Sequence, residues 1–331
     1  MLRKYRLRIA VVAGLLAAAL SVIVFGPARA SAFDNARWGK NYFPNLPLTT
    51  QDGVTVHFYD DLIKGKVVAI DLIYTHCAGS CPLETARLAQ VQKMLGDRVG
   101  KDIFFYSISI DPDNDTPEEL KAYAEKYHAG PGWLFLTGKK EDIDLISKKI
   151  GLYSAPNPRN SDGHTPSLLL GNEATGQWMR NAALDNPRFL AIMIGDFLNS
   201  WKNAKPMVTP QNYANAPALT IDHGQYVFAS HCAACHTVGR GDNIGPDLKG
   251  VTEAREAAWL RRFIASPDKM LAEGDPLAVS LFGKYKKVNM PNLRLADDDV
   301  DAVIGFLRTQ SQAAQTGPAT AEKAAGGVSL K

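Results

Sequence analysis

From residue 33 to about residue 201, short apolar runs alternate with stretches that have the spacing of helices. The run at residues 67–74 is nearly continuously apolar, which predicts a strand buried on both faces of a sheet. A helix is predicted at 82–95, a second strand at 103–110 and a second helix at 117–127. This alternation predicts an α/β domain.

A second region, residues 219–312, ends in a strongly helical pattern. Its last predicted helix opens at Asp297 and has apolar residues at i, i+3, i+4 and i+7, namely Val300, Val303, Ile304 and Leu307. Residues 202–218 are rich in Pro, Asn and Ala, whereas residues 313–331 are rich in Ala, Gly and Thr without an apolar period. We therefore predict an α/β domain at 33–201, a linker, a small all-α domain at 219–312 and a disordered tail.

The chain begins with a targeting segment at residues 1–30. Basic residues precede an uncharged apolar run of 17 residues, 9–25, and the segment ends in Ala28-Arg29-Ala30, the small-x-small pattern that a signal peptidase cleaves. A run of this length is also at the short limit for crossing a bilayer. A cleaved signal peptide and an N-terminal inner-membrane anchor both stay open, and with either one the remaining chain is predicted to be exported to the periplasm.

Charge and cysteine content exclude two further classes of protein, those that bind nucleic acid and those built on a disulfide scaffold. The formal charge of +3 includes five basic residues of the targeting segment, and without them 32 Lys and Arg stand against 34 Asp and Glu. The mature chain is thus faintly acidic, and no nucleic acid is expected as a partner. Its four cysteines are too few for a disulfide scaffold and form two close pairs, which points to chemistry.

The second pair, Cys232 and Cys235, belongs to a Cys-x-x-Cys-His string that ends at His236. In this motif the thiols attach to the haem vinyl groups and the histidine becomes the proximal iron ligand, which predicts haem c. The surrounding region resembles a class I cytochrome c. The resemblance implies that Met290, followed by proline, is the sixth iron ligand, with Met270 as the alternative.

The same resemblance implies two packing features of residues 219–312. Gly224 on the first helix would meet Phe306 on the last helix where the two helices cross. The carbonyl of Pro246 would accept the ring N–H of His236, which fixes the ring and raises its basicity.

The first pair, Cys77 and Cys81, follows the first predicted strand and has one more residue between its thiols than a thioredoxin motif. Strand ends of this kind carry the site in open α/β sheets. If the following helix includes both cysteines, their side chains lie on one face. The two sulfurs can then reach one soft ion or each other, and two thiolates plus an imidazole suit copper.

The segment from Tyr74 to Pro82 resembles the Sco/SenC family, thioredoxin-like copper-handling proteins that serve cytochrome oxidase assembly. The resemblance covers the whole α/β domain. It implies that His164, which precedes an apolar run at 167–170, is the third copper ligand beside Cys77 and Cys81. Further matching segments are Gln51-Asp52-Gly53, Phe58 to Leu62, Ser109 to Pro112, Asp115 to Pro117 and Leu136 to Gly138.

Two local features accompany this resemblance. Thr116 to Glu119, with proline at the first helical position, has the pattern of a capping box. The run that begins at Thr165 resembles the strand that follows a cis-proline in thioredoxins, which predicts a cis peptide bond before Pro166.

Together these features predict a copper-binding assembly factor for the binuclear copper centre of cytochrome oxidase, with an attached electron-transfer haem. Two alternatives stay open. One is a periplasmic thiol-disulfide oxidoreductase with Cys77 and Cys81 as its catalytic dithiol and with electrons passed to haem, and the other is a haem-coupled peroxide reductase. The predicted partners are the copper-bearing oxidase subunit, or another periplasmic cuproprotein or thiol protein, and a redox partner for the haem.

Overall fold

The computed structural model describes residues 38–77, 79–155, 164–198 and 222–313. The predicted targeting segment and linker lie outside these residues, as does the predicted tail after its first residue. Among the described helices, none combines the length and the apolar character that a membrane crossing needs.

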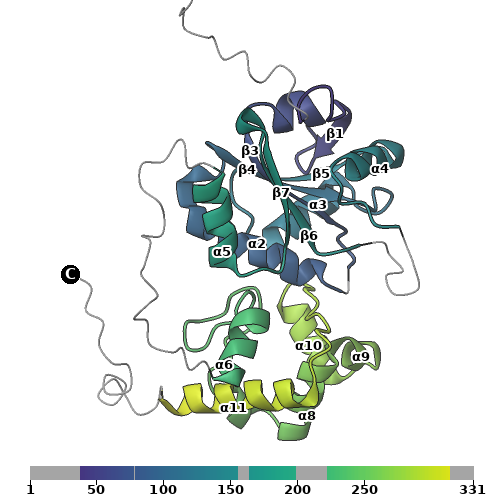
Figure 1. The fold of residues 1–331 in the computed structure, drawn as a ribbon. Coiled ribbons are helices and arrows are strands. Elements are labelled where there is room, and N and C mark those ends of the chain that lie inside the picture. The colour runs from purple at the N-terminus through teal and green to yellow at the C-terminus, as the bar shows by residue number, and fades with distance from the viewer. Residues whose placement is uncertain (1–37, 78, 156–163, 199–221, 314–331) are drawn as a thin grey trace, which may run out of the picture. The chain divides into compact units, whose positions relative to one another are not determined.

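A seven-stranded sheet with the order β2-β1-β5-β4-β3-β6-β7 forms the centre of the first domain. Neighbours β3, β4 and β5 run parallel, whereas β1, β2, β6 and β7 pair antiparallel. The mixed sheet and its helices confirm the predicted α/β class (Figure 1). The strands are β1 (Pro47–Thr50), β2 (Thr55–His57), β3 (Val67–Ile73), β4 (Ile103–Ser109), β5 (Trp133–Thr137), β6 (Ser167–Asn172) and β7 (Gln177–Ala182).

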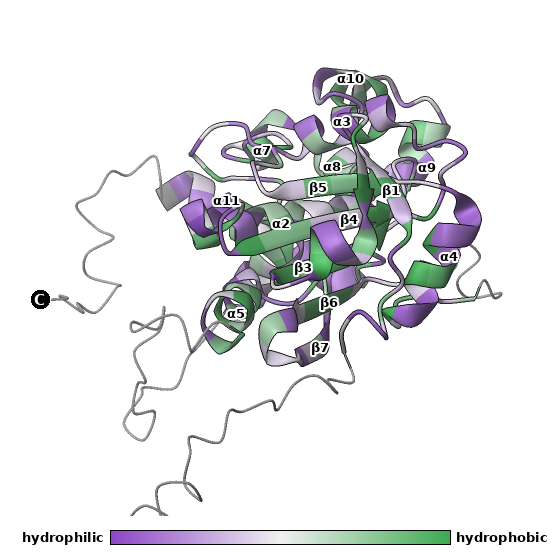
Figure 2. Ribbon diagram, turned by 90° about the horizontal axis from the view of Figure 1, so that it is seen from above, coloured by the Kyte–Doolittle hydropathy of each residue, from purple (hydrophilic) through white to green (hydrophobic). Residues whose placement is uncertain are grey.

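Strand β3 is buried along its whole length, as its continuous apolar run predicts. Val67, Ala69 and Ile73 belong to a core that includes residues of helices α2, α3 and α5, and the alternate residues Val68 and Ile70 pack on the other face with α4. Figure 2 shows β3 mainly green, whereas α4 carries both green and purple segments. These helices are α2 (Cys81–Leu95), α3 (Pro117–Lys126), α4 (Lys140–Lys149) and α5 (Pro187–Ile192).

Two helix starts matter for the site. Helix α3 begins after Thr116, whose hydroxyl accepts the backbone N–H of Glu119 at 3.3 Å, so the predicted N-terminal cap is confirmed. Helix α2 begins at Cys81, so Cys77 lies in the preceding loop and not on the helix. The condition under which one helix face would carry both thiols is therefore not met.

The second domain is helical, as predicted. Helix α6 crosses the long helix α11 at Gly224, where an added Cβ would stand 2.1 Å from the carbonyl oxygen of Ala302 and 2.8 Å from Cβ of Phe306 (Figure 1). Val300, Val303 and Leu307 of α11 are buried. The helices are α6 (His223–Val227), α7 (Val251–Ala254), α8 (Ala257–Ala265), α9 (Pro267–Ala272), α10 (Pro276–Lys284) and α11 (Asp297–Ala313).

Candidate copper and haem sites

The first candidate site lies at the carboxyl end of β3. The chain leaves β3 at Ile73, turns through Cys77 and enters α2 at Cys81. Strand β6 pairs antiparallel with β3, with Asp71 opposite Leu168, so the residues just before β6 lie at the same edge of the sheet. His164 therefore reaches the two cysteines from a distant part of the sequence.

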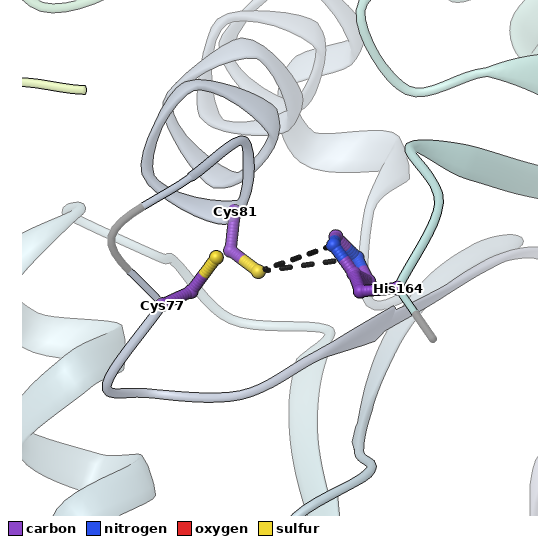
Figure 3. Close-up of side chains that lie close together, drawn as sticks. All are labelled: Cys77, Cys81 and His164. Carbon is purple, nitrogen blue, oxygen red and sulfur yellow. Dashed lines mark hydrogen bonds between the residues drawn. The ribbon is translucent and has the colours of Figure 1, made fainter. Parts of the chain in front are cut away.

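Figure 3 shows Cys77, Cys81 and His164 directed toward one another from these elements. One ligand atom from each residue lies within 4.8 Å of the others, and Cys81 Sγ lies 3.6 Å from His164 Nδ1. In a trigonal site, ligand atoms roughly 2.0 to 2.3 Å from a metal lie roughly 3.5 to 4.0 Å apart. The separation between Cys81 and His164 fits this range, and separations of up to 4.8 Å in the cluster exceed it by less than about 1 Å, so a small side-chain movement would bring the three donors to metal-binding distances.

The orientation of the His164 ring selects one nitrogen as the ligand. Nε2 lies 2.8 Å from the carbonyl oxygen of Leu72, which can only accept a hydrogen bond, so Nε2 carries the proton. Nδ1 is then the nitrogen with the lone pair, and it lies 3.6 Å from the Cys81 sulfur and 3.4 Å from the Ser80 hydroxyl. Such a backbone hydrogen bond on the opposite nitrogen fixes the ring of many metal-binding histidines.

The two thiols have different proton affinities. The hydrogen bond from the Cys81 thiol lowers the pKa of Cys77 to about 6, and a hydrogen bond from Tyr74 acts in the same direction. Burial raises the pKa of Cys81 above its ordinary value. At neutral pH the site therefore contains a Cys77 thiolate beside a protonated Cys81, which is the pattern of a dithiol with one nucleophilic sulfur.

Sequence analysis missed two buried acids beside this cluster. The Oε2 atom of Glu84 lies 3.7 Å from His164 Nε2, and burial raises the pKa of Glu84 to about 8. Asp71 on β3 accepts a hydrogen bond from Ser107 at 2.7 Å, and burial raises its pKa to about 7. The sequence offered one signal for Asp71, because it is the only acidic residue within the apolar run 67–74.

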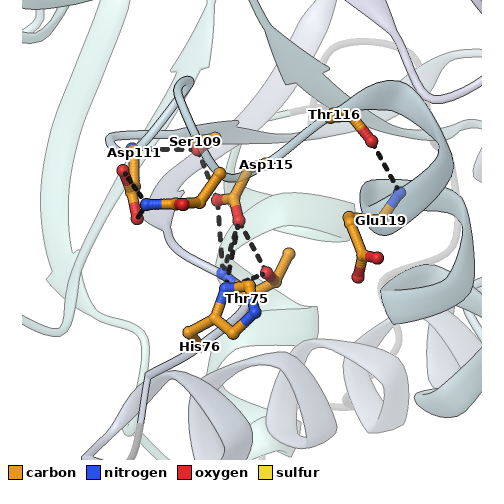
Figure 4. Close-up of polar contacts among 8 residues, drawn as sticks. Thr75, His76, Ser109, Asp111, Asp115, Thr116 and Glu119 are labelled. Carbon is orange, nitrogen blue, oxygen red and sulfur yellow. Dashed lines mark hydrogen bonds and ion pairs between the residues drawn. The ribbon is translucent and has the colours of Figure 1, made fainter.

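A third acid, Asp115, holds the loop that leads to Cys77. Its fully buried carboxylate accepts the Thr75 hydroxyl at 2.6 Å, the Thr75 backbone N–H at 3.2 Å and the Ser109 hydroxyl at 2.5 Å (Figure 4). His76 follows Thr75 and lies at the surface, with Nδ1 3.1 Å from the Thr75 hydroxyl oxygen. The carboxylate thus joins the ends of β3 and β4.

The segment between His164 and β6 departs from the sequence prediction. The described residues contain no cis peptide bond, so the Thr165–Pro166 bond is trans and the cis prediction is wrong. The backbone N–H of Ser167 bonds back to the Thr165 carbonyl, and the Pro166 carbonyl accepts the N–H of Ala183. Here the His164 side chain faces the dithiol, so the backbone needs no cis bond to approach it.

The second candidate site is a cavity in the helical domain. Its lining includes Cys232, Cys235, His236 and Met290 together with apolar side chains such as Phe263. A cavity with two thiols and an imidazole from one motif and a thioether from another segment fits a covalently attached haem.

The contacts around this cavity agree with the expected histidine orientation. The Nδ1 atom of His236 donates to the Pro246 carbonyl at 2.9 Å, as predicted. Met290 lines the cavity, whereas Met270 is 1% exposed in the packed interior and is absent from the lining residues described. His231 lines the cavity too, and exposed His223 pairs with Asp299 at 2.9 Å.

Comparison with known proteins finds a different family in each of two parts of the chain. Residues 37–183 match the SCO1/SenC family model, and residues 221–311 match the cytochrome c family model. The SCO1 protein homolog of Bacillus subtilis is 39% identical over 114 residues, which are 34% of this chain and 58% of that protein. The SCO2-like protein of Rickettsia felis is 28% identical over 160 residues, 46% of this chain and 73% of that protein.

Two solved structures are similar to separate parts of the chain. A SCO1/SenC family lipoprotein from Bacillus anthracis is 30% identical, covers 46% of this chain and 91% of its own, and has a TM-score of 0.40. The cytochrome c domain of a Pseudomonas putida protein is 47% identical, covers 28% of this chain and 92% of its own, and has a TM-score of 0.27.

Proposed function

The chain joins a SCO1/SenC domain to a cytochrome c domain, and from this premise we propose that it is a copper-binding assembly factor for the binuclear copper centre of cytochrome oxidase. The observation that supports the proposal most directly is the convergence of Cys77, Cys81 and His164 within 4.8 Å. Copper is the cargo of this site. Its partner would be the copper-bearing oxidase subunit or another periplasmic cuproprotein.

The donor set explains the choice of metal. Two thiolates supply the softness that favours Cu(I), and a neutral imidazole adds a ligand that also suits Cu(II). Because His164 comes from the segment before β6, which is distant in sequence from the cysteines, the unfolded chain cannot assemble the three donors. Copper binding is thus tied to folding of the domain.

In the second domain, Cys232 and Cys235 would attach haem c, and His236 and Met290 would be its axial ligands. When bound, the haem supplies a one-electron iron centre, and thioether ligation raises its potential. Protein dithiol couples lie at about −120 to −270 mV, so electrons would pass from the dithiol or from Cu(I) toward the haem. The haem domain is therefore proposed as an electron-transfer module with its own redox partner.

A thiol-disulfide oxidoreductase is the second candidate function, favoured by the Cys77 pKa of about 6. The same two sulfurs would then exchange with cysteines of a partner thiol protein. A haem-coupled peroxide reductase is the third alternative.

Export is also part of the proposal. Residues 1–30 would act as a signal peptide or an inner-membrane anchor and place both domains in the periplasm. The domain limits 33–201 and 219–312, with a linker at 202–218 and a disordered tail at 313–331, remain proposals as well.

Metal and thiol analysis of the full chain, purified under reducing conditions with and without added Cu(I), tests the three functions. One bound copper per chain with both thiols protected from alkylation supports the assembly factor, and absence of copper uptake overturns it. Rapid turnover of a disulfide substrate without metal would favour the oxidoreductase. Peroxide-dependent oxidation of the haem would favour the peroxide reductase.

A matched pair of variants tests the ligand set. His164→Ala should keep the disulfide chemistry but lose most Cu(II) affinity and at least about 10-fold in Cu(I) affinity, because even residues behind a ligand typically contribute about 10- to 100-fold. His57→Ala, at a histidine whose side chain is 53% exposed, should bind copper like the parent. Equal copper binding by the His164 variant and the parent would remove His164 from the site.

A further inference from the structure

The three candidate copper ligands are buried, which poses a problem for copper exchange. Cys77, Cys81 and His164 are 3%, 0% and 9% exposed. A copper ion held by a donor molecule cannot contact side chains that are enclosed to this degree. His76, directly before Cys77 in the chain, has a side chain that is 66% exposed.

Hydrogen bonds fix the tautomer of His76. The Thr75 hydroxyl donates its one proton to the buried Asp115 carboxylate at 2.6 Å. Its oxygen, 3.1 Å from His76 Nδ1, can therefore only accept a hydrogen bond from that nitrogen. Nδ1 then carries the proton of the neutral ring, and Nε2 has the free lone pair.

His76 is thus a surface imidazole whose Nε2 lone pair can bind a soft metal ion. In Figure 4 the Asp115, Thr75 and His76 side chains follow one another from the loop before α3 to the loop that carries Cys77. The Asp115 carboxylate also accepts hydrogen bonds from the Ser109 hydroxyl and from the Thr75 backbone N–H. These bonds fix the position of the carboxylate to which the Thr75 hydroxyl donates. A solvated surface histidine would need none of these contacts.

We propose that His76 Nε2 is the first ligand of Cu(I) as copper arrives from a soft-ligand donor, with Thr75 and Asp115 as its positioning residues. This inference rests on the proposed copper function. The bond between copper and the donor molecule breaks as the Nε2–copper bond forms. The Nε2–copper bond then breaks as the Cys77 sulfur binds copper. Copper stays Cu(I) throughout, and the Cys81 proton leaves to water when its sulfur binds the metal.

The test is the rate of Cu(I) transfer from a Cu(I)–bicinchoninate complex to the reduced full chain, at one fixed pH and without oxygen. His76→Ala should slow the transfer about 10-fold or more and leave the final copper stoichiometry and affinity unchanged, because His76 is absent from the final ligand set. His57→Ala is the matched control at another exposed histidine and should transfer at the parent rate.

Two variants at Thr75 separate positioning from folding. Thr75→Val keeps the shape but removes the hydroxyl, so it should slow transfer as His76→Ala does, whereas Thr75→Ser should restore the parent rate. Nitrogen-15 spectra of the imidazole provide a readout without copper: the parent and the serine variant should show the Nδ1–H tautomer, and the valine variant should lose it.

The outcomes distinguish two failures. A parent chain that takes up no copper would overturn the proposed function and the role of His76 with it. A parent that takes up copper while His76→Ala transfers at the same rate would overturn the His76 role alone. Loss of final copper affinity in His76→Ala would also overturn it, since His76 would then belong to the resting site.

Discussion

Asp71 provides a sharp test of the electrostatics around the dithiol. Its carboxyl is 1% exposed on β3, accepts a hydrogen bond from Ser107 and has its pKa raised by burial from 3.8 to about 7. The folded protein therefore holds a proton that the unfolded chain releases at lower pH. Replacing Asp71 by Asn removes the titration and keeps the size of the side chain.

The two pKa values determine whether stability rises or falls with pH. Below about pH 3.8 the carboxyl is protonated in both states, and its contribution to stability is fully present. As the pH rises, the unfolded chain ionises first, so the free energy of unfolding falls until the folded group ionises near pH 7. The interval between 3.8 and about 7, at about 1.36 kcal/mol per pH unit, corresponds to about 4 kcal/mol.

Urea unfolding at a series of pH values, followed by tryptophan fluorescence, measures this effect in the first domain, while the haem absorption band follows the second. Relative to the parent, Asp71→Asn should gain up to about 4 kcal/mol between pH ~4 and ~8. Asp97→Asn, at a side chain that is 97% exposed, should follow the parent curve within about 0.5 kcal/mol. Parallel curves for Asp71→Asn and the parent would refute the argument.

Three further predictions concern the thiols and the haem domain. The alkylation rate of Cys77 should rise with pH around a midpoint of about 6, because its thiolate is the reacting form, and a midpoint near 9 would contradict the hydrogen bond from its partner thiol. Met290→Ala should abolish the weak near-infrared absorption band of thioether ligation and lower the haem potential. Met270→Ala should keep the band and destabilise the domain by about 2–5 kcal/mol. Loss of the band in the Met270 variant but not in the Met290 variant would make Met270 the ligand. Gly224→Ala should destabilise the haem domain by at least about 1–3 kcal/mol in urea unfolding, because the added Cβ would stand 2.1 Å from a carbonyl oxygen. Gly305→Ala on α11 is the control, because its added Cβ would meet nothing within 4 Å, and it should cost no stability.

The sequence was informative wherever a local pattern determines position. The buried run at 67–74 predicts the strand that leads to Cys77, and the pairing of β6 with β3 accounts for the place of His164. Periodicity also predicts α11, because its buried residues recur at helical spacing.

Other features depend on contacts that no local pattern encodes. Glu84 lies on α2 in a stretch with ordinary helical polarity, and only the folded chain places it, fully buried, 3.7 Å from His164 in the segment before β6. The start of α2 at Cys81 depends on the loop conformation, which a spacing of four residues does not determine. The role of Asp115 likewise arises from the meeting of two strand ends.

The charge balance of the buried site accommodates both copper states. With a thiolate at Cys77 and a proton on Cys81, the unloaded pair carries one negative charge. Exchange of the Cys81 proton for Cu(I) leaves that charge unchanged, so the low-dielectric interior adds no new penalty. Exchange of the same proton for Cu(II) brings the pair and its ion to zero net charge, so Glu84, whose pKa burial raises to about 8, can keep its proton. The protein interior thus accommodates Cu(I) with no change of charge and Cu(II) with a gain of one positive charge that neutralises the site, so neither copper state requires a further buried group to change its charge.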